Sequence, residues 1–292
     1  MINQGRLALA CTLCWVVTAC QPTGGDSAAD FSSDSPPEVI ADSLIGVWID
    51  ALGGMDAYHE FQAASYTITT IIIDTLSGRV KRARPRYVWI KKTPRGQATR
   101  VERWEGNDFI VQGFDGQDHW ATMNSEALSE GDKDWNEARY VAGDLFYWPG
   151  LPYKLRDEGV FLHYRGLASR PGVEMRTDPA APAETETPNT YHTVGVTFGE
   201  NVGDHQDVWQ YFFKPGEIFP REVTYIEEGR ENMSRVIWGD TEMTGAPNYP
   251  VVARRDWVTA SGKRTKALVV SDFVVNPEIS QSMFERQTAS ER

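Results

Sequence analysis

The sequence predicts an α+β fold in which one large antiparallel sheet is accompanied by two helices. Runs with alternating, often β-branched residues recur along the chain and are joined by turn residues such as Asp115-Gly116. Two other segments repeat their apolar residues at helical spacing. Strands and helices do not alternate regularly as they do in parallel β/α folds, so antiparallel pairing is favoured.

Composition is that of a globular chain and excludes several classes of function. The 292 residues are 41% hydrophobic and 24% charged, which argues against general disorder and against many membrane spans. The formal net charge is -12, and the isoelectric point is about 4.9. Nucleic-acid binding is not expected, because it needs a basic face.

The first twenty residues have the features of a lipoprotein signal. Arg6 precedes the apolar run Leu7–Val17, which is too short to span a bilayer as a helix. Val17-Thr18-Ala19-Cys20 resembles the bacterial lipobox, so residues 1–19 are predicted to be removed and Cys20 to be lipidated. Gln21 in place of aspartate favours an outer-membrane anchor facing the periplasm. An ordinary secretory signal with a chance cysteine is the alternative.

The expected mature chain has a tether and one domain. Cys11 and Cys14 lie inside the signal, so no intramolecular disulfide is expected. Residues 20–37 are small and polar after the cysteine and predict a flexible tether. Residues 38–292 are expected to form a single domain, with a loop insertion at about 178–189 that is rich in Pro, Ala and Glu.

Each element of the domain is predicted from its periodicity. Residues 40–52 show one apolar helical face, which Gly53-Gly54 ends. Five strands joined by short turns then predict a meander: 65–74, 79–92, 97–105, 108–114 and 118–123. A second helix is predicted over 134–147 and ends at Trp148-Pro149-Gly150. Strands resume at 160–167, 173–177, 192–198, 208–214, 222–227, 233–238, 251–258 and 265–275.

Several motifs resemble a known superfamily. They are Ala51-Leu52-Gly53-Gly54, the hairpin Phe114–Trp120, the middle stretch Trp148–Val160, and the ending Val274–Ile279 with Phe284. Together they resemble the lipoprotein-carrier and lipoprotein-insertase proteins (the LolA/LolB-like superfamily) and their uncharacterised bacterial lipoprotein relatives. The resemblance implies a strongly curved antiparallel sheet, an incomplete barrel, with helices packed on its concave apolar side. In the carriers this side holds acyl chains.

Motifs for catalysis are absent. The sequence has no G-x-S-x-G elbow, phosphate-binding G-x-x-x-x-G-K or dinucleotide-binding G-x-G-x-x-G. A non-enzymatic protein without a cofactor is therefore expected. The acidic segment 200–207 is interpreted as a polar hairpin loop, with Asp204 and Asp207 as weak candidates for Ca²⁺ ligands or hydrolytic carboxylates.

Aromatic residues supply the candidate ligand site. The concave face of one curved sheet has to meet helices or a ligand, and large rings suit both. The predicted cavity-lining residues are Trp48, Trp89, Trp104 and Trp120. Ordinary core packing is the alternative for each single tryptophan. The first functional hypothesis is accordingly a lipid-anchored protein whose half-barrel binds an acyl chain, another hydrophobic ligand or a lipidated partner.

A basic stripe supplies the competing hypothesis. Residues 79–95 carry eight positive charges and no acid: Arg79, Lys81, Arg82, Arg84, Arg86, Lys91, Lys92 and Arg95. Arg82, Arg84 and Arg86 are the predicted contacts for lipid head groups or an acidic partner. On this reading the protein is a periplasmic interaction module without a ligand cavity. The charges and Pro85 also suit protection of an exposed strand edge. The sequence leaves the oligomeric state open.

Overall fold

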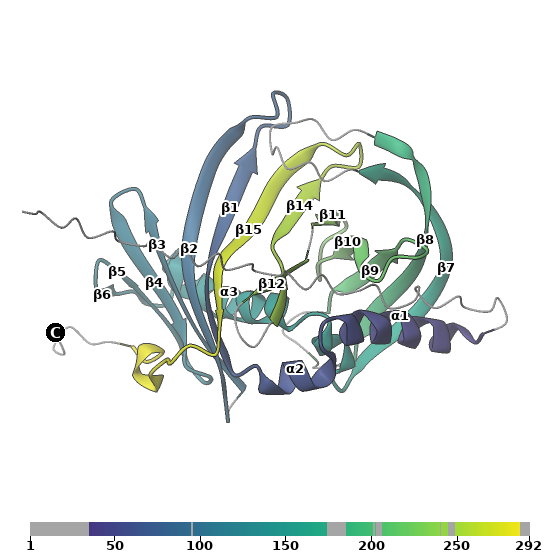
Figure 1. Ribbon diagram of the computed structural model, residues 1–292. Coiled ribbons are helices and arrows are strands. Elements are labelled where there is room, and N and C mark those ends of the chain that lie inside the picture. Colours follow the sequence, from purple (N-terminus) through teal and green to yellow (C-terminus); the bar gives the residue numbers. More distant parts are fainter. Residues whose placement is uncertain are drawn as a thin grey trace, which may run out of the picture.

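A computed structural model describes residues 35–94, 96–173, 185–200, 202, 206–239, 241–244 and 249–286. These residues form a 13-stranded sheet in the order β6-β5-β4-β3-β2-β1-β15-β14-β11-β10-β9-β8-β7, beside a two-stranded ribbon of β12 and β13. The end strands β6 and β7 do not pair with each other, so the sheet is open. Figure 1 shows it bending round the helices, with α3 between its two halves. The predicted α+β class and the open curved sheet are confirmed.

Most element bounds follow the predicted periodicity, but the predicted strand 251–258 is divided between two strands, Tyr249–Val252 and Arg254–Val258, and the strands Glu126–Ala127 and Thr241–Thr244 were not predicted. The helices of the described residues are α1 (Pro37–Ala51), α2 (Gly54–Glu60) and α3 (Lys133–Gly150), with 3₁₀ turns η1 (Tyr153–Arg156) and η2 (Gln281–Met283). The first strands are β1 (Ala63–Ile73), β2 (Val80–Thr93), β3 (Gly96–Glu105), β4 (Asp108–Phe114), β5 (His119–Met123) and β6 (Glu126–Ala127). The others are β7 (Val160–Val173), β8 (Thr185–Phe198), β9 (Val208–Phe213), β10 (Pro220–Ile226), β11 (Met233–Trp238), β12 (Thr241–Thr244), β13 (Tyr249–Val252), β14 (Arg254–Val258) and β15 (Arg264–Val275).

The N-terminal helices differ from the prediction in one respect. α1 buries the expected apolar stripe and ends where Gly53 adopts a left-handed conformation, with φ of 92°. No helix was predicted between Gly54 and the strand that begins near residue 65, whereas the structure has the helix α2 there. This helix has seven residues and none of them is buried, so it has no apolar periodicity that could predict it.

The middle of the sheet departs from the expected insertion. Strand β7 runs without interruption from Val160 to Val173, and its register shifts around Gly166, which has φ of 86°. Strand β8 already begins at Thr185, so residues 185–189 belong to a strand and not to a loop. Residues 178–184 of the expected insertion lie outside the described residues, as do the predicted signal, Cys20 and most of the tether.

The two faces of the sheet are covered differently. On the concave face α3 packs over β3 to β5, where the Ala142 carbonyl accepts a hydrogen bond from Thr99 Oγ1 at 3.3 Å. On the opposite face the C-terminal segment is held by Trp120, which donates its indole N–H to the Phe284 carbonyl at 2.8 Å. No α-helix within the described ranges combines the length and the apolarity needed to cross a membrane.

Candidate functional site

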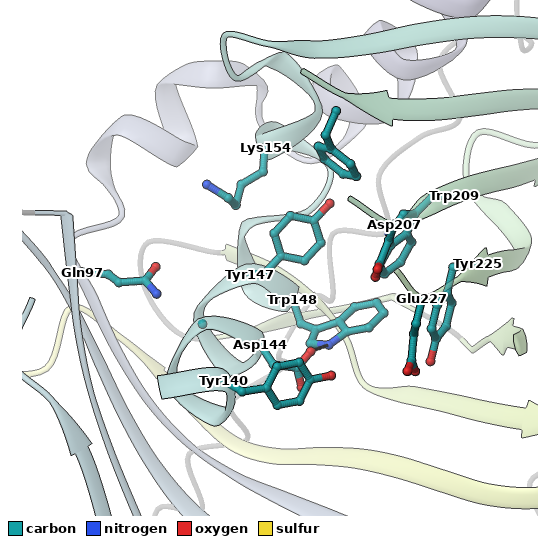
Figure 2. Close-up of a pocket in the computed structure, with 12 residues that line it drawn as sticks. Gln97, Tyr140, Asp144, Tyr147, Trp148, Lys154, Asp207, Trp209, Tyr225 and Glu227 are labelled. Atoms are coloured by element: carbon teal, nitrogen blue, oxygen red, sulfur yellow. Dashed lines mark hydrogen bonds between the residues drawn. The ribbon is translucent and has the colours of Figure 1, made fainter. Parts of the chain in front are cut away.

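A cavity of about 270 Å³ lies on the concave side, between α3 and strands β8 to β10. Its aromatic lining consists of Tyr140, Tyr147, Trp148, Phe198, Trp209 and Tyr225. Its polar lining consists of Gln97, Asp144, Lys154, Asp207 and Glu227, with Gly143 completing the wall. Figure 2 shows the α3 side chains facing those of the two strands. Ligand sites usually combine a mainly apolar wall with a few polar groups in this way.

One wall is a single face of α3. Tyr140, Asp144, Tyr147 and Trp148 stand at the spacing i, i+4, i+7 and i+8, which places them along one side of a helix. Asp144 Oδ1 accepts a hydrogen bond of 2.6 Å from Trp148 Nε1, which fixes the two side chains relative to each other. Other residues of α3, including Ala138, Ala142 and Leu145, are buried in the core.

The other wall comes from two neighbouring strands. Trp209 of β9 and Tyr225 of β10 are direct cross-strand partners, and their rings stack with centroids 4.9 Å apart. The Trp209 ring also lies 5.6 Å from the ring of Trp148, which joins this wall to the helix. Asp207 and Glu227 flank the ring pair, because each is two residues from its ring along the strand direction.

Tyr147 of the cavity lining lies next to a second phenol, Tyr211, which is fully buried and is not part of the lining. The hydroxyl groups of Tyr147 and Tyr211 are buried close to each other, yet neither has a hydrogen bond of normal geometry. Burial, with the negative charge of Asp157 as a smaller cause, raises the pKa of Tyr147 well above its ordinary value. Burial of Tyr211 raises its pKa in the same direction. Both phenols are therefore protonated at neutral pH, and Tyr147, which lines the cavity, can hydrogen-bond to a ligand.

The charges behind α3 are unusual. Burial raises the pKa of the Asp144 carboxyl, while its hydrogen bond with Trp148 and the positive charges of Arg255, Lys266 and Arg86 oppose the rise. Arg255 is only 2% exposed and lies over the Trp148 ring, 4.3 Å from its centroid. Its burial lowers its pKa to about 10. One carboxyl group thus lies close to three cationic side chains on the sheet side of the helix.

The structure places the four predicted tryptophans elsewhere. Trp48 is buried on the concave side, where its ring lies 5.3 Å from Trp238 and 5.7 Å from Tyr211. Trp104 is 61% exposed and contacts Phe109, with ring centroids 5.0 Å apart. Neither lines the cavity.

Trp89 and Trp120 lie on the face of the sheet opposite α3. Trp89 pairs with Arg100, Arg100 pairs with Gly113, and Gly113 pairs with Trp120, so all four share one face. Thr99, the residue before Arg100, contacts α3 on the concave face. Arg100 and its three partners therefore lie on the opposite face of the sheet. Trp120 serves the packing of the C-terminal segment.

The basic stripe is divided between both faces of β2. Arg82, Arg84 and Arg86 share the concave side, since they pair with Ile72, Thr70 and Ile68 of β1. Arg84 forms an ion pair of 2.7 Å with Glu105, Arg86 is half-buried near Asp144, and Arg82 is exposed.

The first half of β2 is a local sheet edge. Residues 80–86 pair with β1, and the register with β3 begins only at Tyr87. An unpaired strand edge of this kind is a site for unwanted pairing, and charged residues on it discourage such pairing. This geometry agrees with the edge-protection interpretation of the stripe. Arg95 lies outside the described residues.

The two aspartates that the sequence suggested in the acidic segment 200–207 have different outcomes. Asp204 lies outside the described residues, while Asp207 stands in the wall of the cavity. Within the described ranges no group of three or more His, Cys, Asp and Glu side chains is arranged to hold a metal ion.

Of the residues that line the cavity, only Asp207 was a candidate site residue in the sequence, and it was considered for Ca²⁺ or hydrolysis and not for a hydrophobic ligand. Trp148 and Trp209 stood out only as two of many tryptophans. The helical spacing of Tyr140, Asp144 and Tyr147 was a usable signal, because two phenols and a carboxylate share a helix face there.

No protein-family model matches the chain, and no curated protein matches its sequence. Among solved structures, a DUF1329 family protein from Desulfovibrio piger is 10% identical with a TM-score of 0.48, covering 86% of this chain and 98% of that chain. An outer membrane lipoprotein-sorting protein domain from Vibrio parahaemolyticus is 7% identical with a TM-score of 0.46, and the match covers 82% of this chain and 96% of that chain. A LolA superfamily protein from Nitrosomonas europaea is 12% identical with a TM-score of 0.44, and the match covers 84% of this chain and 97% of that chain. One of these three structures, the protein from Nitrosomonas europaea, carries the name of the superfamily that the sequence motifs resemble.

Proposed function

We propose that the protein is a non-enzymatic, lipid-anchored protein of the cell envelope that binds the apolar part of an amphiphilic ligand. One observation carries the proposal: a cavity of about 270 Å³ on the concave side of the open sheet has six aromatic side chains in its lining. The location is an inference from the lipobox-like residues at Cys20.

The cavity suits a segment of an acyl chain. Its volume of about 270 Å³ lies just below the range of about 300–1,000 Å³ that is common for small-molecule sites, so it suits a part of a ligand such as a segment of a chain. Each methylene that moves from water into such a site contributes about 0.8 kcal/mol. Because the rings of Trp148, Trp209 and Tyr225 already contact one another or their neighbours, little ordering entropy is lost on binding.

The interaction module on the basic stripe is the second candidate. Arg79 and Arg82 are exposed, and neither forms an ion pair within the described ranges. Exposed cations of this kind suit head groups or an acidic partner. That hypothesis assumed a filled concave side, however, and the cavity supports the first proposal.

Native mass spectrometry of the mature chain from residue 21, secreted behind a cleavable signal, tests the proposal. We expect an adduct of lipid mass that Trp209→Leu weakens, because the substitution removes the larger part of one wall. Trp104→Leu is the matched control, since this tryptophan is exposed and outside the cavity. Circular dichroism checks that both variants fold.

A second variant keeps the test decisive if Trp209→Leu does not fold. Tyr140→Ala removes a ring at the cavity that is 53% exposed, so little core packing is lost. A clean mass for the unmodified chain, together with no binding of added decanoate or decyl maltoside, contradicts the proposal.

A further inference from the structure

Two carboxylates of the cavity face it from the strand side. Asp207 precedes β9 and Glu227 follows β10, one step beyond the paired residues Val208 and Ile226. Because side chains alternate along a strand, both carboxylates project to the same side as Trp209 and Tyr225. Figure 2 shows them beside these rings, across the gap from Tyr140.

These charges have little compensation from the protein. Asp207 accepts a hydrogen bond of 2.9 Å from the Glu228 backbone N–H and forms no ion pair within the described ranges. Glu227 pairs with Arg230, whose side chain is 69% exposed, and exposed pairs of this kind contribute at most about 1 kcal/mol.

The basic residue of the lining does not offset them. Lys154 forms an ion pair of 2.7 Å with Asp157, and Figure 2 shows its side chain directed away from the two carboxylates. The cations on the sheet side, Arg255, Lys266 and Arg86, lie near Asp144 and offset that carboxyl group. Lys266 also attracts Glu227, but because it is shared with Asp144 it offsets Glu227 only in part. Surplus negative charge is therefore concentrated at Asp207 and Glu227.

The phenol of Tyr140 is also affected by the negative charge of these carboxylates. Tyr140 is half-exposed, and its pKa is raised to about 12, first by burial of the phenol and then by the negative charges of Asp144, Glu227 and Asp207. The three carboxylates therefore act on one aromatic side chain at the cavity. The faces of tyrosine and tryptophan rings attract cations, and they do so more strongly where water is excluded.

We propose that this cavity binds amphiphiles with a cationic head group, either a protonated amine or a quaternary ammonium, which sits among Tyr140, Asp207 and Glu227. The apolar part of the ligand lies deeper, against Trp148, Trp209 and Phe198. The inference rests on the proposed function and names the chemical class of its ligand. An anionic head group would meet two carboxylates at the same place and is disfavoured.

The test uses amphiphiles that share a ten-carbon chain and differ only in the head group. They are decyltrimethylammonium, decylammonium, decanoate and decyl maltoside, titrated below the concentrations at which they form micelles. Isothermal titration calorimetry measures each affinity on the mature chain from residue 21. We expect both cations to bind at least tenfold more tightly than decanoate, and the affinity for the neutral maltoside to lie between that for the cations and that for decanoate. Added salt should reduce the difference in affinity between the cations and decanoate.

Charge-removing variants locate the effect. Asp207→Asn and Glu227→Gln are expected to lower the affinity for both cations about three- to tenfold and to leave that for decyl maltoside unchanged. Asp118→Asn is the matched control, because this carboxylate is exposed in the hairpin after β4 and lies outside the cavity. Tighter binding of decylammonium supports a hydrogen-bonded ammonium, and tighter binding of decyltrimethylammonium supports contact with ring faces.

The outcomes separate this inference from the proposed function. Equal affinity for the four compounds, or a preference for decanoate, overturns the cationic head group and leaves hydrophobic binding in place. Cation affinity that both variants leave unchanged also overturns it. If none of the four compounds binds, the proposed function itself is wrong.

Discussion

Replacing Arg255 by methionine is expected to stabilise the protein. This arginine lies on β14 and is 2% exposed, and within the described ranges its side chain has no hydrogen bond or ion pair. Burial lowers its pKa from 12.5 to about 10. Each pKa unit corresponds to about 1.4 kcal/mol, so the fold disfavours the charged side chain by about 3 kcal/mol.

Arg255→Met removes this penalty and some favourable contacts. The guanidinium lies 4.3 Å from the ring centroid of Trp148 and 5.9 Å from that of Trp238, and losing both contacts costs about 1–2 kcal/mol. Methionine fills a similar volume with an apolar chain, as is typical of successful replacements of buried charges. The net expectation at pH 7 is a gain of about 1–2 kcal/mol in the free energy of unfolding.

Urea unfolding followed by tryptophan fluorescence measures the change. The midpoint should rise while the denaturant slope stays constant, since the surface exposed on unfolding hardly changes. Arg82→Met is the control, because an exposed arginine without an ion pair should alter stability by less than about 0.5 kcal/mol. A loss of more than about 1 kcal/mol in Arg255→Met would refute the reasoning. It would mean that attraction to Asp144 outweighs the cost of burial.

Two further predictions follow from the fold and the cavity. Gly113→Ala should cost about 1–3 kcal/mol of stability, because its Cβ would overlap the indole of Trp120, which also bonds to the Phe284 carbonyl; an unchanged urea midpoint would contradict this. Asp144 has a raised pKa in the fold, so the folded state binds its proton more tightly, and stability falls as the pH rises above its ordinary value of 3.8. Asp144→Asn should lose this decline, and urea midpoints measured between about pH 4 and about pH 8 should then be flatter than those of the unmodified chain; parallel curves for the two proteins would show the reasoning to be wrong.

Most elements could be predicted from the chain because their signals are local. The β-branched alternation of residues 65–74 and the turn Asp115-Gly116 specify strands and a hairpin among near neighbours. The structure confirms the meander of β1 to β5 in consecutive order. The helix α2 and the early start of β8 at Thr185 were missed, because neither carries a clear apolar period.

The cavity depends on contacts between distant segments. Strand β1 pairs with β15, for example Ile68 with Val270. This pairing joins the two halves of the open sheet and so places β9 and β10 opposite α3. Trp209 and Tyr225 become partners only through that register. No spacing along the chain records which helix covers which strands.

The sequence by itself determined the α+β class, the position of most strands, and the absence of familiar catalytic motifs. Only the tertiary structure decided which tryptophans face the cavity. Trp89 alternates with the buried Val88 and Ile90, so the strand pattern shows that they lie on opposite faces but not which face is concave. That choice follows from the helices packing on one side, because burying the apolar stripe of α1 and the inner face of α3 requires the sheet to curve around them.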